Sequence, residues 1–204
     1  MILYNKNKTQ LTEDRNTRVN YVLDRRQNDL TVVLENVNDP HNIAAVLRTC
    51  DAVGIMEIFV LNTTVNTYKH FDDRKSSSAN KWMIVHQYTN ITECFEHVRK
   101  QYQTIYSTHL DEKTKDLYSL DLTQSVALVF GNERNGISPE TLALCDGNFI
   151  IPQVGMIQSL NISVACAVSL YEAFRQKNLQ KHYESKKVNY AQEAKLLNQW
   201  DLKK

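Results

Sequence analysis

Residues 126–138 read VALVFGNERNGIS, an apolar run followed at once by a glycine, a carboxylate and a second glycine. A short apolar run bounded by a turn is typical of a buried strand. Gly131 and Gly136 allow the close backbone approach or positive φ that a sharp turn needs. Ser138 can cap a following helix. The stretch therefore predicts a strand, a turn and a helix, the repeating pattern of an α/β fold.

The rest of the chain alternates short β-type runs with helical ones, which predicts a parallel sheet with crossover helices. The predicted strands cover 31–35, 57–61, 83–86, 104–107, 126–130 and 148–151, and the predicted helices cover 40–53, 91–101, 139–145 and 161–177. A length of 204 residues with 42% apolar content is enough for one sizeable core.

Two further segments place small polar residues beside apolar runs. Asp39 followed by Pro40 is typical of a helix start, and that helix carries Asn42 and Arg48. Residues 152–163 lead from a strand into the last predicted helix. Because ligands of open α/β folds bind at the edge where the carboxyl ends of the strands meet, the three segments together predict one site.

The helix over 40–53 is predicted to be amphipathic. Its buried face comprises Ile43, Val46, Leu47 and Cys50, and its open face comprises His41, Ala44, Ala45, Arg48 and Ala52. Two interpretations of Arg48 fit this pattern. The arginine can pair with nearby Asp51 as a structural group, or it can face a ligand, since the small alanines leave room for one.

Several classes of protein are disfavoured by the sequence. The glycines around Glu133 match neither the dinucleotide fingerprint nor a P-loop, so phosphate cradling of a nucleotide is not expected. The four cysteines are widely spaced and have no metal-ligand pattern, which predicts no metal site and a reducing, cytoplasmic location. No apolar stretch reaches the length of a membrane span, and the polar N-terminus does not resemble a secretory signal.

Charge is distributed unevenly along the chain. Residues 1–28 hold six basic and three acidic groups, residues 175–204 hold eight and three, and the middle holds ten and seventeen. Basic ends on an acidic body are compatible with nucleic-acid binding or with solvated helix ends. On a helical projection, Arg15, Arg18, Arg25 and Arg26 fall within one arc of about 100°. Residues 190–200 carry apolar side chains at helical spacing, which predicts a helix docked on the body or on a partner.

The three segments resemble the SpoU branch of the SPOUT methyltransferases, and more narrowly the TrmH group of tRNA guanosine 2′-O-methyltransferases. The resemblance is carried by Asn42 and Arg48 in N-x-x-x-x-x-R, Gly131, Glu133 and Gly136 in G-x-E-x-x-G, and Ser159, Leu160 and Asn161 in S-L-N. It covers about residues 30–177. The family implies a C-terminal trefoil knot in the sheet, S-adenosylmethionine as cofactor, and a homodimer. We expect an N-terminal helical extension over 1–28, the methyltransferase domain over 29–177, and a C-terminal helical extension over 178–204.

The resemblance also implies roles for individual residues. The catalytic set is Arg48, Asn42 and Glu133, and the cofactor-binding set is Gly131, Asn132, Glu133, Ile151, Ser159, Leu160 and Asn161. The basic residues expected to contact RNA are Arg15, Arg18, Arg26, His41, Arg175 and Lys177. Because a guanidinium stays charged and has no free acceptor pair, we expect Arg48 to bind and polarise the ribose and its phosphate rather than act as a base.

Within the family, the two extensions make the chain similar to the enzymes that methylate guanosine-18 in the tRNA D-loop. The expected activity is therefore 2′-O-methylation of that ribose with S-adenosylmethionine. Two alternatives stay open at this point. One is a ribose methyltransferase acting on rRNA or on another tRNA position, and the other is an RNA-binding module that has kept the fold without the chemistry.

Overall fold

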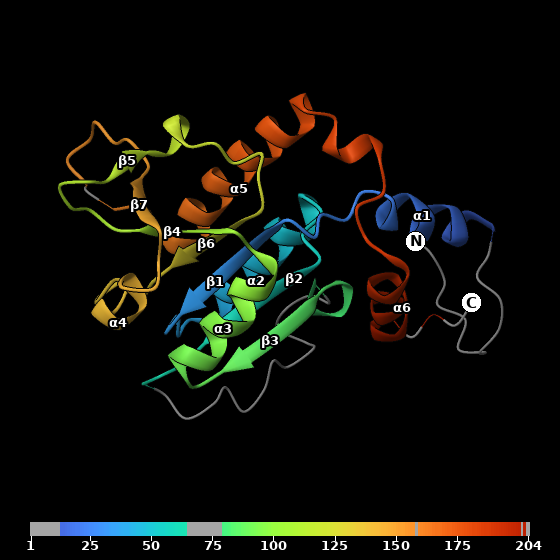
Figure 1. Cartoon of the computed structure of the whole chain (residues 1–204), viewed down its shortest axis with the longest axis horizontal. Coiled ribbons are helices and arrows are strands. Elements are labelled where there is room, and N and C mark those ends of the chain that lie inside the picture. The colour runs from blue at the N-terminus through green and yellow to red at the C-terminus, as the bar shows by residue number, and fades with distance from the viewer. Residues whose placement is uncertain (1–12, 65–78, 158, 201, 203–204) are drawn as a thin grey trace.

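The computed structural model describes residues 13–64, 79–157, 159–200 and 202. Within these residues the chain forms a seven-stranded sheet in which every neighbouring pair of strands is parallel (Figure 1). The strand order is β3-β2-β1-β6-β4-β7-β5. The strands are β1 (Leu30–Glu35), β2 (Glu57–Leu61), β3 (Ile84–Tyr88), β4 (Thr104–Thr108), β5 (Lys115–Asp116), β6 (Val126–Phe130) and β7 (Gly147–Ile150).

Helices accompany the sheet along the described chain. The α-helices are α1 (Glu13–Leu23), α2 (Pro40–Ala52), α3 (Ile91–Gln101), α4 (Pro139–Leu142), α5 (Ile162–Leu179) and α6 (Tyr190–Gln199). The shorter 3₁₀ helices are η1 (Ala79–Trp82), η2 (Leu117–Ser119) and η3 (His182–Glu184).

The sheet is sandwiched between two layers of helices. α2 and α5 pack on one face, where they join Val32 and Leu34 of β1 in one apolar cluster. α3 and the end of α4 pack on the other face, with Val33 of the same strand. Because β1, β2 and β6 are covered on both faces, every residue in them is buried, and apolar side chains stand at adjacent positions rather than at alternate ones.

The sequence-based predictions of the strands are confirmed, with each end within two residues of the observed one. The predictions missed β5, because its two residues are charged and exposed. The helix predicted over 139–145 ends at Leu142. The backbone N–H groups of Leu144 and Cys145 bond to carbonyls three residues back, which tightens the chain out of the α-helical form.

The prediction for the faces of α2 is confirmed for its apolar side, since Ile43, Val46, Leu47 and Cys50 are all buried. It is wrong for Ala44, which was expected on the open face and is buried. The reason is that α2 packs against α5 as well as the sheet, so more than one side of the helix is covered.

Strand β7 lies between β4 and β5, and pairs with both. These two neighbours are joined by residues 109–114 alone, so β7 enters between strands that are close in sequence. Such an insertion is rare among ordinary sheet connections and is compatible with a chain that returns through an earlier loop. The trefoil knot itself stays a prediction.

The described parts of the two terminal segments pack together at the end of the sheet where β2 and β3 begin (Figure 1). They form a separate apolar cluster, whose buried members are Leu23, Met56, Ile84, Val188, Leu196, Leu197, Trp200 and Leu202. The helix predicted over 190–200 is confirmed as α6, which is docked on the body through this cluster.

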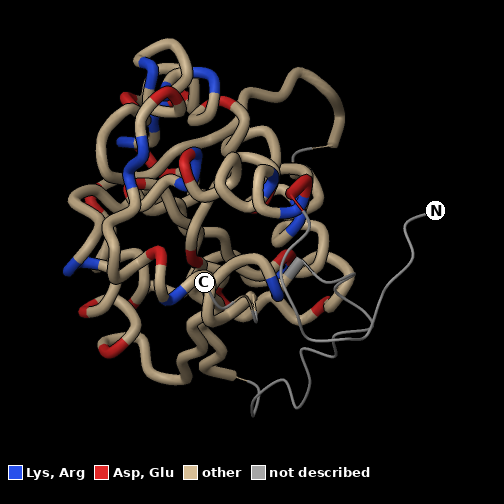
Figure 2. The backbone as a smooth tube through the Cα atoms, turned by 90° about the vertical axis from the view of Figure 1, so that its right-hand side faces the viewer, with Lys and Arg blue, Asp and Glu red and all other residues tan. Residues whose placement is uncertain are grey.

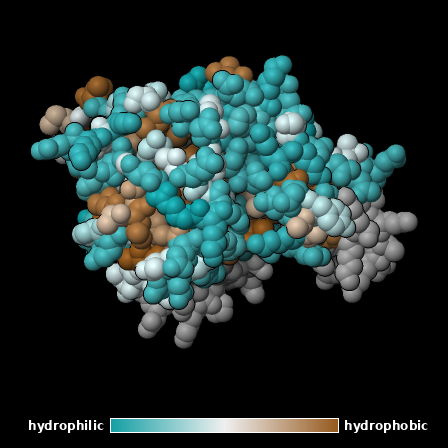
Figure 3. All heavy atoms as spheres, viewed as in Figure 1, coloured by the Kyte–Doolittle hydropathy of each residue, from teal (hydrophilic) through white to brown (hydrophobic). Residues whose placement is uncertain are grey.

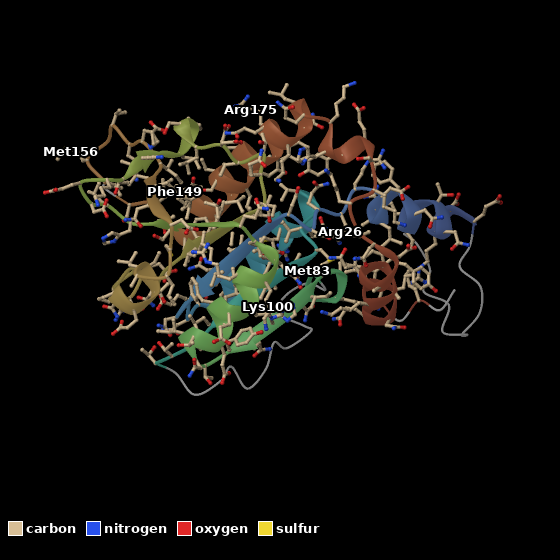
Figure 4. The ribbon with its side chains drawn as sticks, in the orientation of Figure 1. Arg26, Met83, Lys100, Phe149, Met156 and Arg175 are labelled. Atoms are coloured by element: carbon tan, nitrogen blue, oxygen red, sulfur yellow. The ribbon has the colours of Figure 1, made fainter. Side chains whose placement is uncertain are left out.

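Arg26 holds this end of the molecule together from inside. Its side chain is 1% exposed, and Nη2 lies 2.6 Å from a carboxylate oxygen of Asp51 in α2. It also donates to the carbonyls of Ile55 and Trp82, each at 2.8 Å. The guanidinium lies over the ring of Trp200 at 5.8 Å, between the sheet and α6 (Figure 4).

This burial contradicts the prediction that Arg26 contacts RNA. The helical projection placed it on one basic arc with Arg15 and Arg18, but α1 ends at Leu23. The N–H of Arg26 then bonds to the carbonyl three residues back, so the chain turns and carries the side chain inward. Arg26 is therefore a structural residue.

We expect Arg26→Met to lower the free energy of unfolding by about 3 kcal/mol, because the carbonyls of Ile55 and Trp82 lose their charged donor. Urea denaturation measures the change. Arg15→Met is the matched control, and its effect should stay within about 0.5 kcal/mol because Arg15 is exposed. Equal effects of the two substitutions would contradict the structural role.

Candidate active site

The carboxyl ends of β1 and β6 lie side by side, since Leu34 pairs with Phe130 in the sheet. The chain after β1 leads into α2, and the chain after β6 forms the Gly131–Gly136 turn. Two of the three sequence segments therefore meet at one edge of the sheet, as expected for an open α/β fold.

A chain of side-chain hydrogen bonds joins all three segments. Asn161, from the third segment, donates through Nδ2 to Oδ1 of Asn42 at 3.1 Å. Asn42 in turn donates through Nδ2 to Oε1 of Glu133 at 2.5 Å. Asn42 lies 91 positions from Glu133 and 119 positions from Asn161 in the sequence, so side chains far apart in the chain are in direct contact. The prediction that the three segments converge is confirmed.

Local structure fixes each of these side chains. Asp39 caps α2 by accepting from the N–H of His41 at 2.8 Å, and Pro40 is the first helical residue, so Asn42 lies in the first turn of the helix. Asn161 caps α5, and its Oδ1 accepts from the N–H of Ser163 at 2.9 Å. The side-chain amide of Asn161 therefore caps α5 through its oxygen and bonds to Asn42 through its nitrogen.

The turn that carries Glu133 is closed by its own backbone. Asn132 and Gly136 exchange two N–H to carbonyl bonds of 3.0 and 2.8 Å, and Gly136 has a φ of +67°. A Cβ atom on Gly131 would lie 2.3 Å from the carbonyl oxygen of Gly136. Both glycines are therefore required by this turn, for different reasons.

Sequence reasoning missed Glu35, the last residue of β1. Its carboxylate is 1% exposed and accepts from the N–H and Oγ of Ser138, at 3.1 and 2.6 Å, and from Oγ1 of Thr141 at 2.9 Å. It therefore anchors the start of α4, and with it the end of the Gly131–Gly136 turn, to β1. The sequence did contain an indication of this role, because a carboxylate at the end of an apolar strand is buried and must then be hydrogen-bonded.

Arg48 lies on α2 six residues after Asn42, and its side chain is exposed. The carboxylate of Asp51, which the sequence offered as a structural partner for Arg48, lies 2.6 Å from Nη2 of Arg26. His41, in the first turn of the same helix, is also exposed.

The remaining predicted cofactor residues lie on the chain from β7 to α5. Ile151 is half-buried, and Ser159 and Leu160 are exposed. Between them the loop exposes apolar side chains, with Met156 at 99% and Ile157 at 75%. Met156 points away from the body of the molecule (Figure 4). Hydrophobic atoms lie at the surface at the same end of the molecule (Figure 3). Apolar groups left open beside polar ones are typical of a ligand or partner site.

The structure separates the basic residues that were predicted to contact RNA. Arg15 and Arg18 are exposed on α1, at the opposite end of the strands from Asn42. Arg175 is exposed but makes two hydrogen bonds of 2.8 Å to the carboxylate of Glu172. These placements leave Arg15, Arg18, His41 and Arg175 accessible to a partner.

Lys177 is a further correction, because its side chain is fully buried. Nζ donates to the carbonyls of Thr123 and Gln124, at 3.1 and 3.0 Å, and lies 3.0 Å from a carboxylate oxygen of Asp29. Burial lowers the pKa of Lys177, and Asp29 opposes that shift. The last turns of α5 pass the start of β6, so this ammonium caps backbone carbonyls and does not reach RNA.

The described residues lack two further features. They contain no group of three His, Cys, Asp or Glu side chains arranged to hold a metal ion. None of their helices is long and apolar enough to cross a bilayer.

A model of the SpoU rRNA methylase family matches residues 29–171. The chain therefore belongs to the SpoU methylase family. The match spans α2, the Gly131–Gly136 turn and α5 as far as residue 171.

Individual relatives extend the match to the terminal segments. The tRNA (guanosine(18)-2′-O)-methyltransferase of Thermus thermophilus is 42% identical over 191 residues, which cover 93% of this chain and 96% of the relative. The enzyme of the same description from Escherichia coli is 39% identical, over 80% of this chain and 70% of its own. The crystal structure of the Aquifex aeolicus TrmH/SpoU tRNA modifying enzyme superposes with a TM-score of 0.83 at 32% identity, covering 94% and 98% of the two chains.

Gly131→Ala tests the turn that presents Glu133. The added methyl group meets the backbone of Gly136, which cannot move without opening the turn, so we expect a loss of more than about 2 kcal/mol of unfolding free energy. Gly155→Ala is the matched control, since no heavy atom lies within 4 Å of the Cβ position there. Urea denaturation of both variants measures the difference, and equal stability would contradict the tight packing of the turn.

Proposed function

We propose that this protein transfers a methyl group from S-adenosylmethionine to the ribose 2′-hydroxyl of guanosine-18 in tRNA. The observation that carries the proposal is the hydrogen-bonded chain Asn161–Asn42–Glu133, which brings the three family motifs to one edge of the sheet. Relatives that bear this activity in their names match the chain almost from end to end.

The residues at this edge suit the proposed cofactor. S-adenosylmethionine has an apolar purine face and methylene groups on its sulfonium sulfur, together with polar amino-acid and ribose groups. The loop between β7 and α5 exposes apolar Ile157 and Leu160 beside polar Ser159 and Asn161, and Gly155 faces open space. Relatives of the family have been crystallised with this cofactor, among them AviRb of Streptomyces viridochromogenes, which has a TM-score of 0.65 at 26% identity. When bound, the cofactor supplies a methyl group on a positively charged sulfur.

Positioning is the main contribution of the chain's own residues. Asn42 holds the Glu133 carboxylate in one orientation through a 2.5 Å bond, and Asn161 holds Asn42. Alignment of reacting groups can supply roughly 7–11 kcal/mol of a rate enhancement. Gly131 allows the tight turn that carries Glu133, and Glu35 fixes the end of that turn to β1. The Glu133 carboxylate is therefore preorganised.

Arg48 contributes charge and geometry. An exposed guanidinium on the helix that carries Asn42 can bind a ribose and its phosphate with two parallel donors. Its charged donors draw electron density from the 2′-hydroxyl, and it offers no acceptor pair for the departing proton. The departing proton leaves through the phosphate, His41 or water.

The choice of tRNA over rRNA is supported by the length of the matches. Relatives described as 23S rRNA guanosine methyltransferases, such as that of Haemophilus ducreyi, align over 78% of this chain and 65% of their own. The T. thermophilus tRNA enzyme aligns over 93% and 96%. These lengths support grouping the terminal segments of this chain with those of the T. thermophilus tRNA enzyme.

We propose in addition that the protein is a homodimer in the cytoplasm. α5 and the preceding loop expose apolar side chains, including Met156, Val164 and Tyr171. An apolar surface of this kind supports a subunit interface.

The proposal is tested by incubating the purified protein with S-adenosylmethionine and an unmodified tRNA transcript, then locating the product by nuclease digestion and mass spectrometry. We expect one 2′-O-methylguanosine, at position 18. A transcript with 2′-deoxyguanosine at that position should accept no methyl group. A methyl group at any other position, or none despite cofactor binding measured by calorimetry, would contradict the proposal.

Arg48→Lys serves as the mechanistic variant in this assay. Lysine keeps the charge but loses the two parallel donors, so we expect turnover to fall about 100-fold with cofactor affinity unchanged. Arg99→Lys is the matched control, because Arg99 pairs with Asp146 just before β7, away from Asn42 and Glu133. Near-normal turnover of Arg48→Lys would exclude the two-donor role.

A further inference from the structure

We infer that Tyr21, Arg18 and Arg25 form a stacking site for an unpaired nucleotide of the tRNA. This inference rests on the proposed function, because it assigns a contact with the same substrate. It concerns the described N-terminal segment, which lies outside the residues matched by the family model.

The three side chains make one compact surface unit. The guanidinium of Arg25 lies 3.7 Å from the centroid of the Tyr21 ring, and that of Arg18 lies 5.3 Å from it. Arg25 also donates through Nη1 to the carbonyl of Tyr21 at 3.1 Å, which holds the guanidinium in place over the ring. The tyrosine is nevertheless 48% exposed. The side chains of this unit thus hold one another in place, while the tyrosine ring stays accessible to solvent.

The arginines of this unit differ in their partners from three other arginines of the described residues, which are paired with carboxylates. Arg26 pairs with Asp51, Arg99 with Asp146, and Arg175 with Glu172. Arg18 and Arg25 have no carboxylate partner within the described residues, and both are directed to an aromatic ring instead. Figure 2 shows Lys and Arg interspersed with Asp and Glu at this end of the molecule, so the attraction for RNA is local rather than that of a broad basic face.

An exposed aromatic ring beside unneutralised guanidinium groups has the chemistry of single-stranded RNA recognition. Nucleobases stack on tyrosine rings and on guanidinium planes, and the remaining N–H donors bind phosphate. A folded tRNA presents unpaired nucleotides in its loops, so it can supply both groups. Duplex RNA cannot, because its bases are already stacked.

The position of the unit predicts which kinetic constant it affects. α1 packs where β2 and β3 begin, whereas Asn42 and Glu133 lie where β1 and β6 end (Figure 1). A strand of five or six residues separates the two by roughly 15–20 Å. The bound nucleotide is therefore not guanosine-18 of the same active site, and the contact contributes to tRNA affinity rather than to the methyl transfer step.

The test compares Tyr21→Leu and Tyr21→Trp in tRNA binding, measured by fluorescence anisotropy with a labelled transcript, and in steady-state methylation. Leucine keeps an apolar side chain without a π face, so we expect tRNA affinity to fall roughly 5- to 100-fold and KM to rise in parallel, with kcat unchanged. Tryptophan should retain or improve affinity. Tyr118→Leu is the matched control, since this tyrosine is 57% exposed on η2 at the far edge of the sheet, and it should behave as wild type.

The arginines are tested through salt dependence. Arg18→Gln and Arg25→Gln should each reduce the slope of log affinity against log salt by about one, whereas the Tyr21 variants should leave that slope unchanged. Melting temperature and calorimetric binding of S-adenosylmethionine, measured on every variant, report on the fold and the cofactor site.

The possible outcomes separate this inference from the proposed function. Wild-type affinity in Tyr21→Leu, or a loss of affinity explained by unfolding, would overturn the stacking site while guanosine-18 methylation stands. Equal loss in the leucine and tryptophan variants would also overturn it. A wild-type protein that binds the transcript through Tyr21 without methylating it would overturn the proposed function and leave the stacking site intact.

Discussion

The position of Asn42 is the constraint on which the site depends. Its amide nitrogen and oxygen bond to Glu133 and Asn161, which come from the other two motifs. An amide is the side chain suited to this position, because it offers a donor on one side and an acceptor on the other. The two segments it joins are further held by backbone constraints, the closed turn after β6 and the cap of α5.

The supporting structure follows from the need to satisfy buried polar groups. Glu35 is buried at the end of β1, and the donors it requires come from Ser138 and Thr141. Its carboxylate thereby ties the end of β1 to the start of α4, beside the turn that carries Glu133. Arg26 and Lys177 donate to backbone carbonyls at the other end of the sheet in the same way. Polar interior groups thus align both ends of a largely apolar core.

Much of this arrangement could be predicted from local sequence. Apolar runs marked the strands, Asp39 and Pro40 marked the start of α2, and the three motifs indicated a common edge. Residues whose role depends on distant partners could not be found in that way. Arg26 and Lys177 look like surface cations in sequence, and only the fold shows that α2 and the start of β6 supply their partners. β5 escaped prediction because two exposed charged residues carry no strand signal.

A double-mutant cycle between Asn42 and Asn161 tests the convergence of the motifs most directly. Asn42→Ala, Asn161→Ala and the double variant would be compared in methyl transfer efficiency, kcat/KM, on a tRNA transcript. Because the two amides are bonded at 3.1 Å, the account predicts a coupling free energy of about 0.5–3 kcal/mol. Strictly additive effects would show that the two residues act independently, and would contradict a site built from one connected chain of side chains.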